Sequence, residues 1–373
     1  MSSHKTLDTL AREVVCQHSR LALQADPLDR LPMHLAPQPT TIIDPAGQAV
    51  YAACHALDFI DIDAQCVASA WQRQSARTGQ FDASAWPTDP QDFDLPRFDF
   101  HEPPPLGSGA LWERRPVGAA PSPRIPPNSL RPEGGPPTKA GAVSCDSSDL
   151  WERRPRREYP ESGSALADGF ASCPHRLGLY AVLPDAAWVG RMARAGVPTV
   201  QLRFKSADPA AITREVEAAV QAVQGTGALL FINDHWQAAI AAGAYGVHLG
   251  QEDLEALGGA DLNAIRAAGL RLGLSSHGYA EMLRAASVRP SYIAMGAVYA
   301  TTLKRMATPP QGLARLTMYA ALLRDTPTVA IGGIDAARLP EVLSSGVGSV
   351  AVVRALVAAD QPEAQVAALQ AMF

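Results

Sequence analysis

The stretch FINDHWQAAIAAGAYGVHLGQED, residues 231–253, decides the fold of this chain. A short apolar run ends at Asn233-Asp234, an alanine-rich segment at helical spacing follows, and a second apolar run ends shortly before Asp253. Two short strands of buried type, one helix apart, are typical of a βα unit in a parallel sheet. Both strands lead into acidic residues. Stability alone does not require that arrangement, but a metal site would.

The same texture recurs through the second half of the chain. Eight apolar runs are each followed by a helix-type segment. The runs are LYAVL (179–183), TVQLRF (199–204), ALLFIN (228–233), GVHLG (246–250), RLGLSS (271–276), YIAMG (292–296), TVAIGG (328–333) and SVAVVRAL (349–356). Eight such units in about 195 residues predict an α/β fold of the TIM (β/α)8 barrel type. A doubly wound open sheet is the alternative, but the turn after the first run has no GxGxxG.

Composition divides the 373 residues into three parts. Residues 1–85 are mixed in composition and form an N-terminal extension, with helices expected at 5–23 and 62–76. Residues 86–173 are rich in Pro, Gly, Ser and Arg, and they bury too little apolar surface to offset their ordering entropy. We therefore expect a low-complexity, disordered linker there. Residues 174–373 carry the barrel.

The linker contains LWERRP twice, at 111–116 and 150–155. Two copies exclude a solenoid, which needs at least three stacked units. A duplicated linker fragment and a docking peptide anchored by Trp112 and Trp151 both remain open.

The net charge of -5 implies no broad basic surface for nucleic acid. Five cysteines at wide spacings, without a CxxC pair, fit a reduced intracellular protein. No run approaches the ~20 apolar residues that span a bilayer. The sequence predicts a cytoplasmic protein without a membrane partner.

In a barrel of this type, functional residues follow the C-terminal ends of the strands. Alternation along the second run places Gln201, Arg203 and Lys205 on one face, which indicates an anionic ligand such as phosphate. A solvated strand end is the plainer interpretation.

The third and fourth runs lead to Asp234 and Asp253, whose carboxylates suit Mg²⁺. Helix capping is the alternative for Asp253, and the neighbouring Glu252 competes as a ligand. His235 and His248 are further candidates for chemistry, although strand and loop histidines are often structural.

Later strand ends add polar groups. Ser275 is placed to bond a ligand or to cap the next helix. A long loop with Thr301 and Lys304 fits a lid that closes on phosphate, or an exposed polar loop. Gly333, Val353 and Arg354 follow the last two strands, where barrels frequently bind phosphate through backbone N–H groups.

These residues carry a family pattern. From about residue 178 to the C-terminus the sequence resembles thiamine-phosphate synthase, along about half of the chain. The matching stretches are VQLRFK, FINDHWQAAIAAGAYGVHLGQEDL, LGLSSH, GAVYATTLK with PPQGL after it, VAIGGI and VAVVRAL. Six motifs in the family's order make the resemblance specific.

The resemblance implies a transferase that joins hydroxymethylpyrimidine pyrophosphate to thiazole phosphate, releasing pyrophosphate, by a Mg²⁺-assisted dissociative substitution. It implies catalytic roles for Arg203, Lys205, Lys304 and Ser275, and Mg²⁺ ligation by Asp234 and Asp253. Substrate-binding positions implied in the same way are Gln201, Arg203, Lys205, Asn233, Ser275, Thr301, Lys304, Gly333, Val353 and Arg354.

Three positions depart from the family pattern. Leu303 stands where a second Thr is frequent, Arg354 where Ser is frequent, and His235-Trp236 where Arg is usual. None of these departures touches the two metal carboxylates. A thiazole tautomerase-like barrel and a non-catalytic phosphate-binding barrel are the alternatives. A homo-oligomer also remains open.

The N-terminal extension has no assigned role. CHALDFIDIDAQCVASAW (54–71) and AWPTDPQDF (85–93) resemble extensions of some proteobacterial synthases. A degenerate remnant of a kinase-type module is one interpretation, without kinase activity, because a phosphate-binding loop is missing. We expect the extension to pack on the barrel or to mediate assembly.

Overall fold

The computed structural model describes residues 6–31, 42, 44–95, 169–301 and 308–373, and all of these belong to one compact unit of the chain. Both LWERRP copies lie outside the described residues, as does most of the expected linker. Leu303 and Lys304 lie outside them too.

The second half of the chain is a closed barrel of eight parallel strands in sequence order, each paired with the next and the first with the last. The strands are β1 (Gly178–Leu183), β2 (Thr199–Leu202), β3 (Leu229–Asn233), β4 (Gly246–Leu249), β5 (Arg271–Ser276), β6 (Tyr292–Met295), β7 (Thr328–Ile331) and β8 (Ser349–Val352). The predicted TIM-barrel fold is confirmed. All eight expected runs contain a strand.

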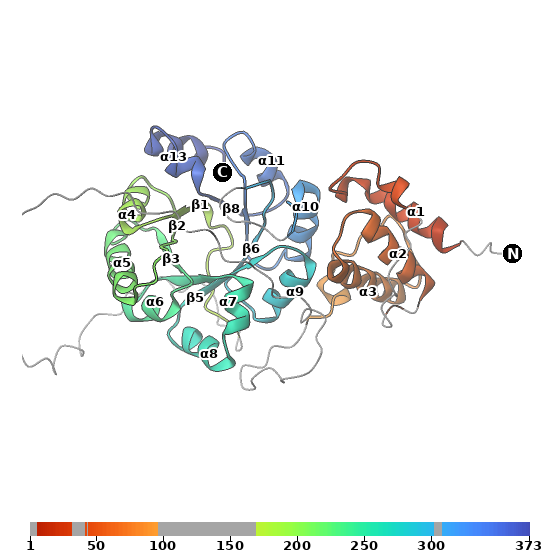
Figure 1. Ribbon diagram of the computed structural model, residues 1–373, viewed down its shortest axis with the longest axis horizontal. Helices are drawn as coiled ribbons and strands as arrows, with labels where there is room; N and C mark the ends of the chain where they lie inside the picture. Colours follow the sequence, from red (N-terminus) through yellow and green to blue (C-terminus); the bar gives the residue numbers. More distant parts are fainter. Residues whose placement is uncertain (1–5, 32–41, 43, 96–168, 302–307) are drawn as a thin grey trace, which may run out of the picture. The chain divides into compact units, whose positions relative to one another are not determined.

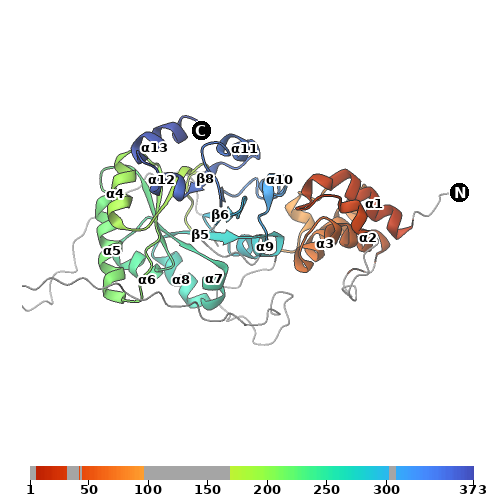
Figure 2. The same ribbon diagram turned by 45° about the horizontal axis from the view of Figure 1, so that its top comes forward.

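Helices surround the barrel on its outside, as both ribbon views show (Figures 1 and 2). They are α4 (Ala186–Arg194), α5 (Pro209–Ala222), α6 (Trp236–Ala242), α7 (Gln251–Ala256), α8 (Gly259–Ala267), α9 (Tyr279–Ser287), α10 (Gly312–Leu322), α11 (Leu339–Ser344), α12 (Arg354–Val357) and α13 (Pro362–Gln370). The opening stretch is β3, α6 and β4, followed by the start of α7. It is the βα unit that its pattern predicts.

Two apolar cores result from the alternation of side chains along each strand. Aromatic rings fill the barrel interior, where Tyr180, Phe231 and Tyr292 lie within 6.0 Å of one another by ring centroid. The opposite faces of the strands pack against the helices in a larger core. Side chains therefore fill the barrel interior, and we expect ligands at the C-terminal ends of the strands.

The N-terminal helical segment is defined here as residues 6–95, and its described residues form helices and no strand. These are α1 (Leu7–His18), η1 (Ser19–Leu21), η2 (Pro27–Arg30), α2 (Pro45–Ala56), α3 (Asp61–Thr78) and η3 (Pro90–Asp92). The expected helices at 5–23 and 62–76 correspond to α1 and α3, whereas α2 was not predicted. Asp44 caps α2 by accepting the Gly47 N–H at 3.3 Å, and Pro45 occupies its first position.

The three-part division of the chain stays a prediction. Trp86 and Phe93, which follow the expected boundary at residue 85, are buried in the larger core. None of the helices in the described part of the chain is long and apolar enough to cross a membrane.

Candidate active site

The C-terminal ends of the strands, called the barrel mouth here, hold the charged residues that follow β2 and β3. Gln201 is the third residue of β2 and only 4% exposed, while Arg203 is half-buried just beyond the strand. The Arg203 N–H donates to the Leu183 carbonyl at 2.7 Å. Lys205 Nζ reaches Asp234 Oδ2 at 2.6 Å. The structure thus joins the basic run after β2 to the acidic end of β3.

Asp234 lies in the left-handed backbone region, with φ of 64°. A non-glycine residue held there costs on the order of 1–3 kcal/mol, so the surroundings must fix it. The Asp234 N–H donates to the His248 carbonyl at 3.0 Å, and its own carbonyl accepts the Trp236 N–H at 2.9 Å. This strained turn directs the Asp234 carboxyl to the point where β3 and β4 end.

Asp253 lies in the first turn of α7 and serves in part as a cap. Its Oδ2 accepts the Gly250 N–H at 2.9 Å. Burial raises the pKa of the Asp253 carboxyl, and the nearby Asp234 raises it further, while Lys205 opposes both. The two carboxyls are therefore close neighbours, and a positive charge between them is favoured.

The donors at the mouth fit Mg²⁺, which typically takes one or two carboxylates from the protein and fills its remaining positions with water and substrate phosphate. Asp234 and Asp253 supply two hard oxygen donors and Asn233 an amide beside them. In the part of the chain that the structure describes, no group of three His, Cys, Asp or Glu side chains is placed to hold a metal. The carboxylate pair is thus the donor set that a divalent cation would find here.

Ser275 ends a buried hydrogen-bonded chain across the barrel. Tyr180 Oη lies 2.8 Å from Tyr292 Oη, which lies 2.7 Å from His248 Nδ1, and His248 Nε2 lies 2.8 Å from Ser275 Oγ. Burial raises the pKa of both phenols, so both keep their protons at neutral pH.

The direction of these three hydrogen bonds follows from Tyr180, the residue at the end of the series farthest from Ser275. Because the Tyr180 hydroxyl has no other acceptor among the described residues, we assign it as the donor to Tyr292. Tyr292 then donates to His248 Nδ1, and His248 Nε2–H donates to Ser275 Oγ. The Ser275 proton is left to donate elsewhere. The arrangement makes Ser275 a hydrogen-bond donor toward the mouth.

The backbone after β7 packs closely against the loop after β6. Gly333 has φ of 66°, and a Cβ there would lie 2.6 Å from the Ala300 carbonyl oxygen. Only glycine fits this approach. Gly333 thus lies beside the residue that precedes Thr301, while the half-buried Val353 and the exposed Arg354 follow β8.

His235 has a structural role in this arrangement. Its Nε2 lies 3.1 Å from the Phe204 carbonyl oxygen, so the ring donates a hydrogen bond that fixes the loop after β2. His248 instead touches Ser275. One of the two candidate histidines is therefore tied to the site residues.

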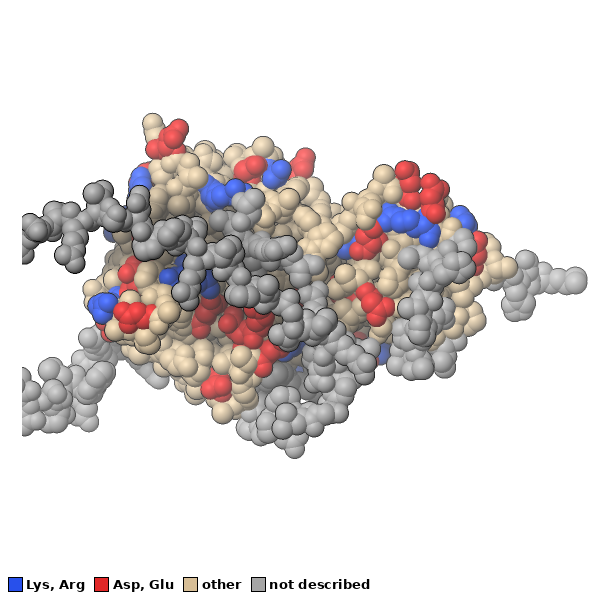
Figure 3. Space-filling view, in the orientation of Figure 1, with Lys and Arg blue, Asp and Glu red and all other residues tan. Residues whose placement is uncertain are grey.

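The sequence did not single out Tyr180, Tyr292 or Gln251. Gln251 Nε2 donates to the Ser275 carbonyl at 2.6 Å and so fixes the strand end. The inward register of the two tyrosines, in the middle of β1 and at the start of β6, was the pattern that could have revealed them. Figure 3 shows basic and acidic side chains beside one another near the centre of the barrel's visible face.

The matches to known proteins fall on the barrel part of the chain. Residues 179–356 match the family model of thiamine monophosphate synthase. The thiamine-phosphate synthase of Neisseria gonorrhoeae is 56% identical over 197 residues, which are 53% of this chain and 95% of that protein. The thiamine-phosphate synthase of Yersinia pestis strain Pestoides F is 53% identical over 188 residues, or 50% of this chain and 86% of that protein. Among solved structures, a thiamine phosphate pyrophosphorylase from Pyrococcus furiosus matches with a TM-score of 0.47 and 28% identity, over 52% of this chain and 95% of that one.

Proposed function

The chain belongs to the thiamine-phosphate synthase family of transferases, and on that premise we propose how its barrel mouth performs the reaction. The substrates are hydroxymethylpyrimidine pyrophosphate and thiazole phosphate, and the products are thiamine phosphate and pyrophosphate. One observation carries the proposal. Asp234, just after β3, and Asp253, in the first turn of α7 after β4, are close neighbours, and Lys205 bonds to Asp234.

Arg203, Lys205 and Lys304 bind the pyrophosphate and stabilise the negative charge that builds on it as the bond to the pyrimidine methylene breaks. Gln201 and Thr301 donate to the same group. Asp234 and Asp253 would hold Mg²⁺, which would neutralise charge on the leaving pyrophosphate. In the structure Lys205 bonds to Asp234, which places its ammonium beside the same site.

Ser275 and Asn233 hold the pyrimidine end. The series of hydrogen bonds from Tyr180 through Tyr292 to His248 orients the Ser275 hydroxyl as a donor. A donor fixed in advance costs no reorganisation during the reaction.

The thiazole phosphate lies against Gly333 and the backbone of Val353 and Arg354. No protein nucleophile is needed, because the thiazole nitrogen attacks the methylene carbon. That nitrogen carries no proton, so its alkylation gives the thiazolium cation directly, and the electron pair of the broken C–O bond leaves with the pyrophosphate. The Arg354 guanidinium adds a second donor to the phosphate.

The test is substitution of the carboxylates in the purified full chain. We expect Asp234→Asn and Asp253→Asn each to lower kcat at least about 100-fold at saturating substrates and Mg²⁺. Asp208→Asn is the matched control, because Asp208 is an exposed carboxylate that caps α5 through the Ala210 N–H at 2.9 Å, a role that Asn retains. Wild-type turnover in either site variant contradicts the assignment.

The same variants separate the alternatives. A phosphate-binding barrel without catalysis would keep most of its affinity in Asp234→Asn. A tautomerase-like barrel would act on the thiazole alone and form no thiamine phosphate. Family membership favours the synthase. The cytoplasmic location and the homo-oligomer stay predictions.

A further inference from the structure

Helix α9 begins without a capping side chain of its own. Its N-cap residue is Gly278, and the cap comes from the N-terminal helical segment, because Asp63 Oδ1 accepts the Ala280 N–H at 2.9 Å across 217 positions of sequence. Asp63 is only 3% exposed. A Cβ on Gly278 would lie 2.2 Å from Asp63 Oδ2, so the missing side chain makes room for the carboxyl. A side chain of the N-terminal helical segment therefore completes this barrel helix.

Helix α10 is held in a similar way by Arg315, which is 3% exposed. Its Nε donates to the Leu21 carbonyl at 3.0 Å and its Nη2 to the Leu57 carbonyl at 2.7 Å. These carbonyls end η1 and α2, where a cation is favoured by the helix dipole. The guanidinium also lies 3.8 Å from the ring centroid of Phe59.

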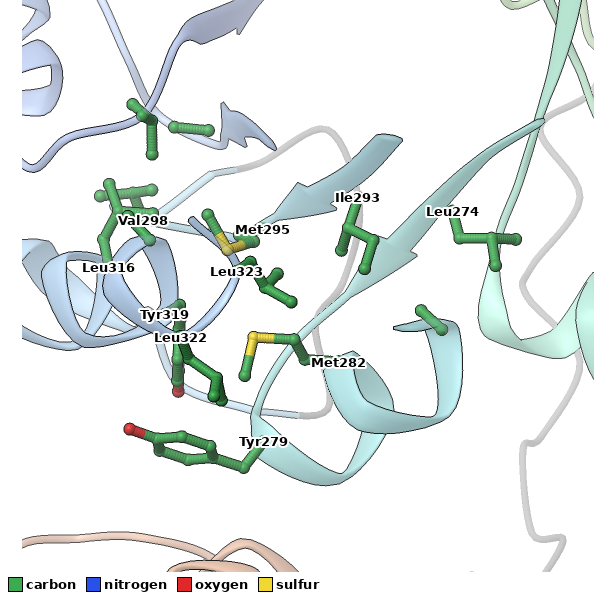
Figure 4. Close-up of a cluster of buried hydrophobic side chains, with 14 of the residues drawn as sticks. Leu274, Tyr279, Met282, Ile293, Met295, Val298, Leu316, Tyr319, Leu322 and Leu323 are labelled. Carbon is green, nitrogen blue, oxygen red and sulfur yellow. The ribbon is translucent and has the colours of Figure 1, made fainter. Parts of the chain in front are cut away.

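Aromatic rings close the space between these two polar contacts. Trp86 Nε1 donates to Tyr279 Oη at 2.8 Å, and Phe93 stacks on the Tyr279 ring at 5.7 Å. Tyr279 meets Tyr319 edge to face at 4.9 Å, and Figure 4 shows these two rings among the side chains of α9 and α10. A buried carboxyl, a buried guanidinium and satisfied ring donors mark this as a specific interface.

Both contacts lead directly to the barrel mouth. Gly278 is three residues after Ser275, so the Asp63 cap fixes the turn that follows the β5 end. Arg315 Nη1 donates to Gln311 Oε1 at 3.3 Å, and the Gln311 N–H donates to the Ala297 carbonyl at 2.8 Å. Arg315 is thereby connected to Gln311 and, through it, to Ala297, four residues before Thr301.

We propose that the N-terminal helical segment contributes to the synthase reaction, in which Asp63 and Arg315 act as positioning residues for the turn after β5 and for residues 297–301 after β6. This inference rests on the proposed function of Ser275 and Thr301 in binding the pyrimidine pyrophosphate. The segment acts on the reaction without touching substrate. Its role is to hold the turn after β5 and residues 297–301 in one geometry.

The first test compares three variants of the full chain well below their melting temperatures. Asp63→Ala removes the cap and should raise the KM for the pyrimidine pyrophosphate about tenfold. Asp63→Asn keeps an acceptor oxygen and should stay within about twofold of wild type. Arg315→Met should act like Asp63→Ala, whereas Arg324→Met, at an exposed arginine just after α10, is the matched control.

A lower melting temperature of Asp63→Ala with unchanged KM would show a purely structural role and overturn the proposal. If the wild-type chain makes no thiamine phosphate at all, the proposed function fails. The interface is then still tested by the second experiment.

The second test inserts a protease site between residues 111 and 164 of the full chain and covers the case that a variant does not fold. After cleavage we expect the two pieces to elute together in gel filtration, with the KM unchanged. Separation into two pieces, with full activity in the barrel piece, contradicts the proposal.

Discussion

One oxygen of the Asp253 carboxyl accepts the Gly250 N–H, and the same carboxyl lies close enough to Asp234 for that neighbour to raise its pKa. Capping and ligation were alternatives in the sequence. In the structure they are compatible, because a carboxylate has several acceptor positions. The cap fixes the rotation of the side chain that is proposed to hold Mg²⁺.

Tyr292→Phe tests the order of protons behind Ser275. The variant leaves His248 Nδ1 without its donor, so the imidazole tautomer is no longer fixed and Ser275 donates only part of the time. We expect kcat to fall about tenfold, whereas Tyr180→Phe, one step further away, should cost about threefold. Steady-state kinetics with each substrate varied in turn measures both. A larger effect from Tyr180→Phe would contradict the order.

Asp63 predicts a pH dependence of stability. Burial raises the pKa of this carboxyl to about 6, against about 3.9 in an unfolded chain, and the facing charges of Arg315 and Glu281 act in opposite directions. Between about pH 4 and pH 6 the folded state binds more protons, so the free energy of unfolding falls as pH rises. Asp63→Asn removes this loss. Denaturation of both proteins at several pH values should show curves that diverge across this window and run parallel above it. Parallel curves throughout would refute the assignment.

At the scale of elements, the contact between α3 and α9 depends on the absence of a side chain at Gly278. Gly278→Ala places a Cβ on the Asp63 carboxyl and should lower the melting temperature by about 2–4 °C, as a loss of about 2 kcal/mol predicts for a protein of this size. Calorimetry measures the shift. Gly258→Ala is the matched control, since Gly258 is the N-cap of α8 and a Cβ there meets only Asp261 Oδ2, at 3.9 Å.

The double variant Gly278→Ala with Asp63→Ala completes this test. Because the clash needs both side chains, the double variant should lose clearly less stability than the sum of the losses in the two single variants. Additive losses would mean that Gly278 and Asp63 act independently.

Elements with local patterns were predictable. Strands buried on both faces read as continuous apolar runs, so β1 to β8 appear in the sequence in order. The run TVQLRF extends beyond its strand, which ends at Leu202, because Arg203 already turns into the mouth. Helix α2 was missed although Asp44-Pro45 is a recognisable helix start. The hydrogen bonds that link Tyr180, Tyr292, His248 and Ser275 could not be predicted from the sequence, because they depend on how four different strands align in the barrel.

At the scale of the whole molecule, the interface between the N-terminal helical segment and the barrel joins residues far apart in sequence. Arg315 and Leu21 are separated by 294 positions and Asp63 and Ala280 by 217. No local periodicity records such a pairing. The sequence left packing on the barrel and assembly as alternatives, and the structure shows packing on α9 and α10.

The most direct test of the account is formation of thiamine phosphate by the purified full chain from both substrates, followed as Mg²⁺ is titrated. We predict turnover that needs both substrates, rises with Mg²⁺ to saturation and disappears in the Asp234→Asn, Asp253→Asn double variant. Turnover that persists without Mg²⁺, or in the double variant, would contradict the site. Its absence in the wild-type chain at every Mg²⁺ concentration would contradict the function.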